Sequence, residues 1–215
     1  MKAGRLIFSL FLACVWGAIL LAGSGDAAAK GAAAPRDQLR PTIDKMIKVL
    51  DDLSLKGDAK RTERRALIME IAHERFDFEE MSKRALGKEW RRRSAQERKN
   101  FVELFTRLLE HAYIGKLESY SGREVTFQDQ RIKGKRAVVK TTVSHNGKEI
   151  PVHYVMILKG DTWMVYDIII EGVSLLRNYI EQFKSILRKE KYAGLVRQLE
   201  DKIKKLENDD GAGQG

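Results

Sequence analysis

One segment of this chain, residues 163–183, changes its hydrophobic period from that of a strand to that of a helix. Up to Ile170 the apolar residues follow the two-residue period of a strand, and a turn is expected at Glu171-Gly172. From Ser174 onward the apolar residues fall on one helical face: Leu175, Leu176, Tyr179, Ile180 and Phe183. Two apolar surfaces of different geometry meet at this corner, so the fold must pack a sheet against helices.

Three more segments with strand periodicity precede this corner. Val125 and Phe127 alternate with polar residues, and residues 137–143 and 149–159 continue the same alternation. Asn146-Gly147 is a strong hairpin signal, and a second turn at Gly160 leads into the strand at 163–170. Four strands joined in order by short turns predict an antiparallel meander.

Helical periodicity fills the remainder of the chain. Helices are predicted over residues 39–53 and 60–75, from Asp77 to Gly87, from Ser94 to Ser121, and over 174–189 and 192–206. Two predicted capping boxes pair Asp77 with Glu80 and Ser94 with Glu97. This order predicts an α+β fold with N-terminal helices, a four-stranded antiparallel twisted sheet and C-terminal helices. A twisted sheet wrapped round helices forms a cone whose interior can hold a cavity.

The first residues have the pattern of a secretory signal peptide. Lys2 and Arg5 precede an uncharged run to Gly23, and small residues follow, with cleavage expected after Ala29 or alternatively after Ala34. An uncleaved membrane anchor is the alternative interpretation of the same run. We therefore expect residues 1–29 to be a signal peptide, 30–38 a flexible linker, 39–206 a single domain and 207–215 a disordered tail.

The chain has 215 residues and a formal net charge of +10, with basic clusters at 91–93, 131–136 and 202–205. These clusters lack the interleaved aromatic residues on which nucleic-acid bases stack. An exported protein also meets little nucleic acid, so we expect no nucleic-acid partner. The clusters are either solvated surface charge or a docking surface for an acidic partner or an anionic membrane. The candidate docking residues are Arg91, Arg92, Arg93, Lys133, Lys135 and Arg136.

The sequence lacks the motifs of a nucleophile elbow, a P-loop or a metalloprotease helix. None of its four histidines has a second ligand at metal-binding spacing, and Cys14, the only cysteine, lies in the expected signal peptide. We therefore expect no metal site and no cofactor. Asp167 and Glu171 would be the acid and base of an alternative, a small cone-fold enzyme acting on an apolar substrate. Strand alternation, however, predicts that Asp167 faces outward.

The predicted inner faces of the strands and of the long helix are rich in aromatic residues and methionine. Met is a flexible side chain that suits a surface whose shape must vary. The residues alone leave two interpretations open, a filled core, which they favour, and the wall of a cavity. The residues concerned are Phe105, Tyr113, Phe127, Tyr154, Met156 and Tyr166.

Two blocks of sequence carry a resemblance to a known family. The first comprises Arg75-Phe-Asp-Phe-Glu-Glu-Met-Ser-Lys-Arg-Ala-Leu-Gly87, Trp90, Ser94-Ala-Gln-Glu-Arg98, Phe101-x-x-Leu-Phe105 and Tyr113-Ile-Gly-Lys-Leu117. The second comprises Trp163-x-Val-Tyr-Asp-Ile-x-x-Glu-Gly-Val-Ser174, Asn178-Tyr179, Gln182-Phe183 and Ile186-Leu-Arg-Lys189. In this order and spacing they resemble the MlaC family, also called the toluene-tolerance auxiliary family, over residues 40–206. The basic surface and the charged second helix depart from the family's pattern.

The resemblance implies a nuclear-transport-factor-2-like cone whose apolar cavity holds the acyl chains of a phospholipid as cargo. It implies a periplasmic carrier, not an enzyme, that maintains outer-membrane lipid asymmetry. Its partners would be an outer-membrane lipoprotein complex and the inner-membrane substrate-binding protein of an ABC transporter, and we expect a monomer. The Glu-Gly-Val-Ser corner assigns Val173 to the pocket side. The expected pocket residues are Phe105, Leu108, Leu109, Tyr113, Phe127, Val139, Tyr154, Met156, Tyr166, Ile168, Val173 and Leu176.

Overall fold

The computed structural model describes residues 31–118, 122–145 and 147–212. The expected signal peptide, with its cleavage site after Ala29, lies outside the described residues. The elements in chain order are α1 (Pro35–Asp51), η1 (Leu53–Leu55), η2 (Asp58–Lys60), α2 (Arg61–Arg75), α3 (Phe78–Leu86), η3 (Gly87–Arg92), α4 (Ala95–Glu118), β1 (Glu124–Lys133), β2 (Arg136–His145), β3 (Lys148–Lys159), β4 (Thr162–Ile170), β5 (Val173–Ser174) and α5 (Leu175–Ala212).

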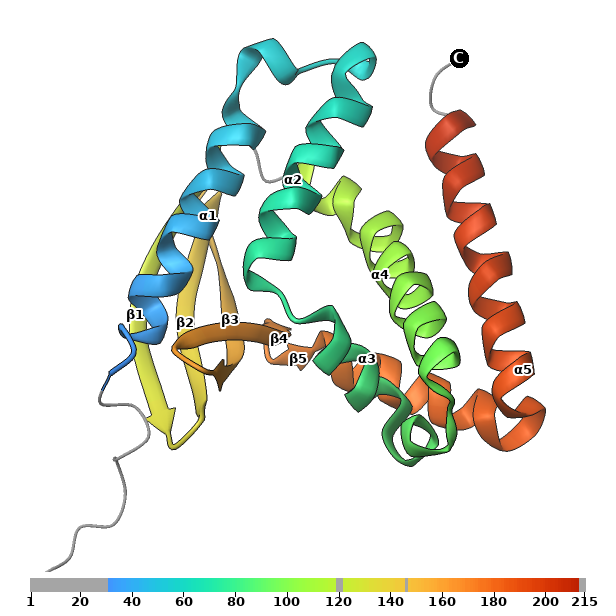
Figure 1. Ribbon diagram of the computed structural model, residues 1–215. Helices are drawn as coiled ribbons and strands as arrows, with labels where there is room; N and C mark the ends of the chain where they lie inside the picture. The colour runs from blue at the N-terminus through green and yellow to red at the C-terminus, as the bar shows by residue number, and fades with distance from the viewer. Residues whose placement is uncertain (1–30, 119–121, 146, 213–215) are drawn as a thin grey trace, which may run out of the picture.

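The predicted α+β class is confirmed, with helices before and after an antiparallel sheet (Figure 1). The sheet order is β1-β2-β3-β4-β5, and each strand runs antiparallel to its neighbour. The fifth strand was not predicted, because β5 contains two residues, too few for an alternating pattern. It pairs with the end of β4 and leads directly into α5.

Local sequence signals account for most helix starts. The Ser94–Glu97 capping box forms in both directions: Ser94 N–H donates to the Glu97 carboxylate at 2.7 Å, and Glu97 N–H donates to the Ser94 hydroxyl at 3.2 Å. Asp77 caps α3 by accepting the Glu80 N–H at 3.0 Å. The reciprocal half of that box was predicted wrongly, because the Asp77 N–H donates to the Val165 carbonyl at 2.8 Å. This bond ties the start of α3 to β4.

Both ends of the folded region are more ordered than predicted. The helix α1 begins at Pro35, so residues 35–38 are helical rather than part of a flexible linker. The Gln38 side chain fixes this end to β4, because its oxygen accepts the Trp163 N–H at 2.9 Å. At the other end α5 continues to Ala212, so residues 207–212 are helical rather than a disordered tail.

The predicted break between two C-terminal helices is confirmed as a sharp bend in α5 at Lys191, where φ is 62°. After the bend α5 turns back and runs beside α4 (Figure 1). Arg107 of α4 and Glu207 of α5 form an ion pair of 2.6 Å between the two helices. Tyr192 adds a hydrogen bond of 3.1 Å from its hydroxyl to the Glu97 carbonyl.

Two large apolar cores hold the fold together, and two smaller clusters pack α1 against α2 and α4. The helical core lies among α3, α4 and α5, where the Phe105 ring packs 5.1 Å from that of Tyr179 and 5.3 Å from that of Phe183. The sheet core lies where α1 covers one face of the sheet, and it joins Leu39 to Trp163 and the inner residues of β2 and β3. Trp163 of the sheet core and Phe105 of the helical core are both almost fully buried.

A β-bulge in β4 separates the two cores. Val155 pairs with Asp167, whereas the next residue of β3 pairs with Val165, so Tyr166 is the extra residue of β4. Strict alternation predicts that Tyr166 and Ile168 share a face, and this prediction is wrong. Ile168 packs in the sheet core with Val165, whereas Tyr166 packs in the helical core. β4 therefore contributes side chains to both cores.

Candidate functional site

An apolar cleft lies between the two cores, bounded by α1, α2, α4 and the sheet. It has two adjoining parts, which we call the methionine chamber, of about 130 Å³, and the sheet chamber, of about 370 Å³. The second volume falls in the range of small-molecule pockets. The two chambers share wall residues from four elements and the start of α5: Ile43, Met46, Tyr113, Leu117, Tyr154, Ile168 and Leu175.

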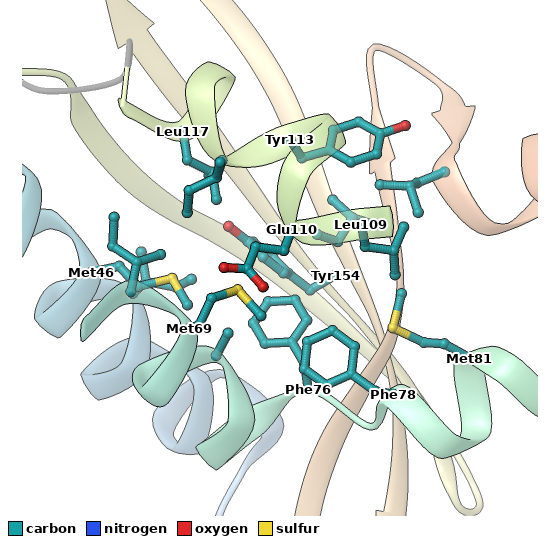
Figure 2. Close-up of a pocket in the computed structure, with 16 residues that line it drawn as sticks. Met46, Met69, Phe76, Phe78, Met81, Leu109, Glu110, Tyr113, Leu117 and Tyr154 are labelled. Carbon is teal, nitrogen blue, oxygen red and sulfur yellow. The ribbon is translucent and has the colours of Figure 1, made fainter. Parts of the chain in front are cut away.

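Side chains from five helices and from strands β3 and β4 line the methionine chamber (Figure 2). Met46 comes from α1, Met69 from α2 and Met81 from α3, while Leu109 and Tyr113 come from α4. Flexible thioethers on three separate helices give this wall an adaptable surface. Such a wall can adjust to apolar groups of different shape.

Tyr113 connects the cleft to the helical core. Burial raises the pKa of the Tyr179 phenol, and a hydrogen bond with the Tyr113 hydroxyl raises it further. Tyr179 lies on α5 and is almost fully buried. The Tyr113 ring therefore stands in the cleft wall while its hydroxyl group is held by the neighbouring core.

The sheet chamber forms where the amphipathic face of α1 stands over the inner face of β1–β4. Apolar residues recur along α1 at helical spacing, and strand alternation brings Val152 and Tyr154 of β3 to the same side. Ile168 and Ile170, which follow the bulge in β4, complete the floor. The apolar residues of α1 in this wall are Ile43, Met46, Ile47 and Leu50.

Few charged side chains line the cleft. Among the described residues, Glu110 is the charged member of the methionine chamber, and Lys116 and Arg123 are those of the sheet chamber. All the other wall residues are apolar or aromatic. The cleft therefore suits a ligand that is mostly hydrocarbon and carries a small polar end.

Asp167 is buried, with 9% of its surface exposed, and does not face outward as predicted. One carboxylate oxygen accepts the Leu176 N–H at 2.9 Å, and the other accepts the Ser174 hydroxyl at 2.6 Å. The Ser174 hydroxyl oxygen accepts the Arg177 N–H at 2.9 Å. These bonds satisfy N–H groups at the start of α5 that lack partners within the helix. Both oxygens of Asp167 thus hold the strand-to-helix corner.

Glu171, the other half of the candidate acid–base pair, is exposed in the turn after β4, with φ of 50°. Its N–H donates to the Pro151 carbonyl at 3.0 Å, which fixes the turn to β3. Gly172, which follows, has φ of 82°, a conformation that favours glycine. Glu171 thus lies outside the walls of the apolar cleft, and the two carboxylates do not converge on it.

The predicted pocket residues divide among four locations. Leu109, Tyr113, Tyr154 and Ile168 line the cleft. Phe105 and Leu108 are buried in the helical core, and Val139, Met156 and Phe127 belong to the sheet core. Tyr166, Val173 and Leu176 line a separate open groove beside α5, where Val173 is 65% exposed and the Arg84 guanidinium stacks 4.0 Å from the Tyr166 ring.

Sequence reasoning missed the contribution of the first three helices to the cleft. Met46 lies on the predicted apolar face of α1, and Ala72 on that of α2, so the periodic pattern contained them. Nothing in the local pattern shows that these faces meet α4 across a space rather than in contact. Met69 and Glu110 also line the cleft, and neither belongs to the apolar positions that the periodic pattern predicts to face inward.

The candidate docking residues lie in two separate places. Lys133, Lys135 and Arg136 are exposed around the turn between β1 and β2. Arg91 and Arg92 are exposed at the end of η3, whereas Arg93 is partly buried, pairing with Glu89 at 2.8 Å and Glu97 at 3.0 Å. Arg93 therefore supports the packing between η3 and α4.

The part of the chain that the structure describes contains neither a cluster of metal ligands nor a membrane-spanning helix. No three acidic, histidine or cysteine side chains converge in a way that could hold a metal ion. No helix there combines the length and the apolar character that crossing a membrane requires.

Known proteins share this sequence pattern and fold. The family model described as MlaC protein matches residues 40–201. The intermembrane phospholipid transport system binding protein MlaC of Haemophilus influenzae is 26% identical over 130 residues, which cover 58% of this chain and 61% of that protein. The aligned region thus spans about three fifths of the curated relative's length.

A solved structure has the same fold. It is the phospholipid-binding protein from Ralstonia solanacearum in complex with a phospholipid, with a TM-score of 0.75 and 25% sequence identity. The similarity covers 81% of this chain and 99% of that one. The family match spans most of the described residues, from α1 into the last part of α5. This chain belongs to the MlaC family.

Proposed function

We propose that this protein is a periplasmic phospholipid carrier that holds acyl chains in the apolar cleft. The observation that carries the proposal is the cleft itself, in which two chambers of about 130 and 370 Å³ adjoin and share almost wholly apolar walls. The phospholipid-bound relative with the same fold supports the same ligand class. The cleft would take the chains, and the headgroup would stay near its mouth.

Transfer free energies explain why such a carrier needs no chemical step. Each methylene is worth about 0.8 kcal/mol on leaving water, so two acyl chains of a dozen or more methylenes are worth on the order of 20 kcal/mol. The donor membrane buries the same chains, so moving a lipid from bilayer to cleft changes the free energy little. The protein therefore removes the aqueous barrier between two apolar environments, and docked partners would set the direction.

The proposed partners follow from the family. The lipid would be exchanged with an outer-membrane lipoprotein complex and with the inner-membrane substrate-binding protein of an ABC transporter. The exposed cations Lys133, Lys135, Arg136, Arg91 and Arg92 are candidates for contacts with acidic partners or with lipid headgroups. Export would follow from the expected signal peptide, with cleavage after Ala29 or Ala34, and the mature protein would act as a monomer.

The alternative, an enzyme using Asp167 and Glu171, has little support. Both Asp167 oxygens accept hydrogen bonds from the start of α5. A general acid or base needs a site beside its substrate, and neither carboxylate lines the apolar cleft. We therefore propose lipid binding without catalysis as the function.

The proposal is tested by phospholipid transfer between vesicles. Donor vesicles carry a radiolabelled phospholipid, and the mature protein is expected to speed its appearance in acceptor vesicles. Ile168→Asp places a charge in the wall of both chambers and should abolish transfer. The matched control is Ile132→Asp, at an isoleucine that is 38% exposed on β1. Transfer by neither wild type nor control, or equal transfer by both variants, would contradict the proposal.

A further inference from the structure

Glu110 stands in the wall of the methionine chamber, and Figure 2 shows its carboxylate pointing into the chamber among apolar side chains. The residue is partly buried on α4. In the described part of the chain, no hydrogen bond or ion pair joins this carboxylate to another residue. The nearby cation Arg107 and His111 are both engaged with Glu207 of α5.

An unpaired carboxylate in an apolar wall destabilises the protein. Partial burial removes water from a charged group, and this loss is offset only by a charge or by hydrogen bonds. Other partly buried acidic residues on the same surface have such partners. Glu118, which directly follows Leu117 of the same chamber's wall, pairs with Arg64 at 2.5 Å and with Arg65 at 3.1 Å. Glu110 differs from it because no described residue supplies such a partner.

We propose that Glu110 is a specificity-determining residue that binds the cationic amine of a phospholipid headgroup. The inference rests on the proposed function, since the acyl chains bring the headgroup to the cleft. An ammonium group is a compact donor of three hydrogen bonds and forms strong, short bonds with a carboxylate. The bound lipid therefore supplies the positive charge that the described residues do not.

The two cations that line the sheet chamber, Lys116 and Arg123, extend this recognition to a zwitterionic headgroup. Tyr113 and Leu117 line both chambers, and Lys116 stands between them in sequence on the sheet-chamber side. Glu110 and Lys116 are separated by about 9 Å along the axis of α4. A headgroup that spans this distance places its amine at the Glu110 carboxylate and its phosphate near the cations Lys116 and Arg123. A headgroup with a phosphate but no amine leaves Glu110 without a partner.

Competition between two lipids tests this assignment. The mature protein is incubated with vesicles of equal parts phosphatidylethanolamine and phosphatidylglycerol, separated from them, and its bound lipids are measured by mass spectrometry. We compare wild type with Glu110→Gln, which keeps the shape and removes the charge. The matched control is Glu103→Gln, which removes the same charge from an exposed position on α4. Thermal unfolding of each variant verifies that the fold is intact.

The wild type and Glu103→Gln are expected to take up phosphatidylethanolamine in preference to phosphatidylglycerol. Glu110→Gln is expected to lower this ratio by about threefold, the size of one partly exposed ion pair. An unchanged ratio in Glu110→Gln, or an equal fall in Glu103→Gln, would overturn the assignment and leave the carrier function standing. If the wild type takes up neither lipid, the assignment and the proposed function both fail.

Discussion

The Asp167 carboxylate on β4 accepts a hydrogen bond of 2.9 Å from the Leu176 N–H in the first turn of α5. The residue that seemed a candidate catalytic acid is therefore a helix cap. It acts from the strand beside the helix, across the corner made by Glu171 and Gly172. Because the carboxylate lies at the positive end of the helix, its charge adds to the effect of the hydrogen bond.

Asp167→Ala is expected to destabilise the protein by about 2 kcal/mol, because it removes one cap and leaves a buried N–H unpaired. Asp167→Asn keeps an oxygen in the same place and should lower the free energy of unfolding by about half as much as Asp167→Ala. Urea denaturation measures both. Ser174→Ala is the comparison, at about 1 kcal/mol, because it removes the cap bond to the Arg177 N–H and the bond from the Ser174 hydroxyl to Asp167. Lipid uptake by Asp167→Asn should match that of wild type, and an Asp167→Ala variant as stable as wild type would contradict the capping role.

Substitution of an alanine by a larger residue distinguishes a position in the cavity wall from a position in a filled core. Ala72 of α2 lines the methionine chamber, so Ala72→Phe should reduce lipid uptake while leaving the free energy of unfolding nearly unchanged. Ala137 is 2% exposed in the sheet core and lines neither chamber, so Ala137→Phe should destabilise the protein by about 1–3 kcal/mol. Lipid uptake and urea denaturation are measured on both. If Ala72→Phe is as unstable as Ala137→Phe, the space beside Ala72 is filled.

Glu118 fastens the end of α4 to α2 beside Leu117 of the cleft wall. Its side chain is 15% exposed and pairs with Arg64 and Arg65, which are 13% and 15% exposed. Glu118→Gln should lower the free energy of unfolding by about 2 kcal/mol, because it removes the negative charge that Arg64 and Arg65 share. Hydrogen exchange should also rise at the start of α2. Unchanged stability and exchange in this variant would show that the cluster contributes nothing to the cleft.

The Ser94–Glu97 box predicts a change of stability in acid. The Ser94 N–H, followed by the Ser94 hydroxyl and Arg93, lowers the pKa of Glu97 in the folded protein. The stabilisation that the Glu97 carboxylate gives the folded protein is therefore complete above about pH 4.3, the ordinary pKa of Glu. It is lost as the pH falls through the lowered pKa of the folded state. The difference in urea midpoint between wild type and Glu97→Gln should shrink between pH 5 and pH 3. A constant difference across that range would contradict this assignment.

The sequence predicts the elements of this fold well because their signals are local. The Ser94–Glu97 box, Gly87 as the stop of α3 and the alternating strands each depend on a few neighbouring residues. The start of α1 was placed too late because Gln38 is fixed by its long-range bond to Trp163. Such a bond joins residues far apart in sequence and leaves no periodic trace.

The cleft was harder to predict than the fold, for two physical reasons. The first reason is the bulge at Tyr166, after which the side chains of β4 point to the opposite face of the sheet from the one that strict alternation predicts. A single inserted residue does not visibly interrupt the alternation of apolar and polar residues in the sequence. An apolar residue also looks the same whether it faces a cavity or a filled core. Phe105 and Tyr113 share one face of α4, yet the first is in the helical core and the second lines the cleft.

The most direct test of the carrier function is the mass of the native protein. The mature wild-type protein is purified from the cell envelope without detergent and weighed by native mass spectrometry, and its lipids are then extracted and identified. We predict a mass above that of the bare chain by one phospholipid, and loss of this increment in Ala72→Phe. A bare chain with no extractable phospholipid would contradict the account.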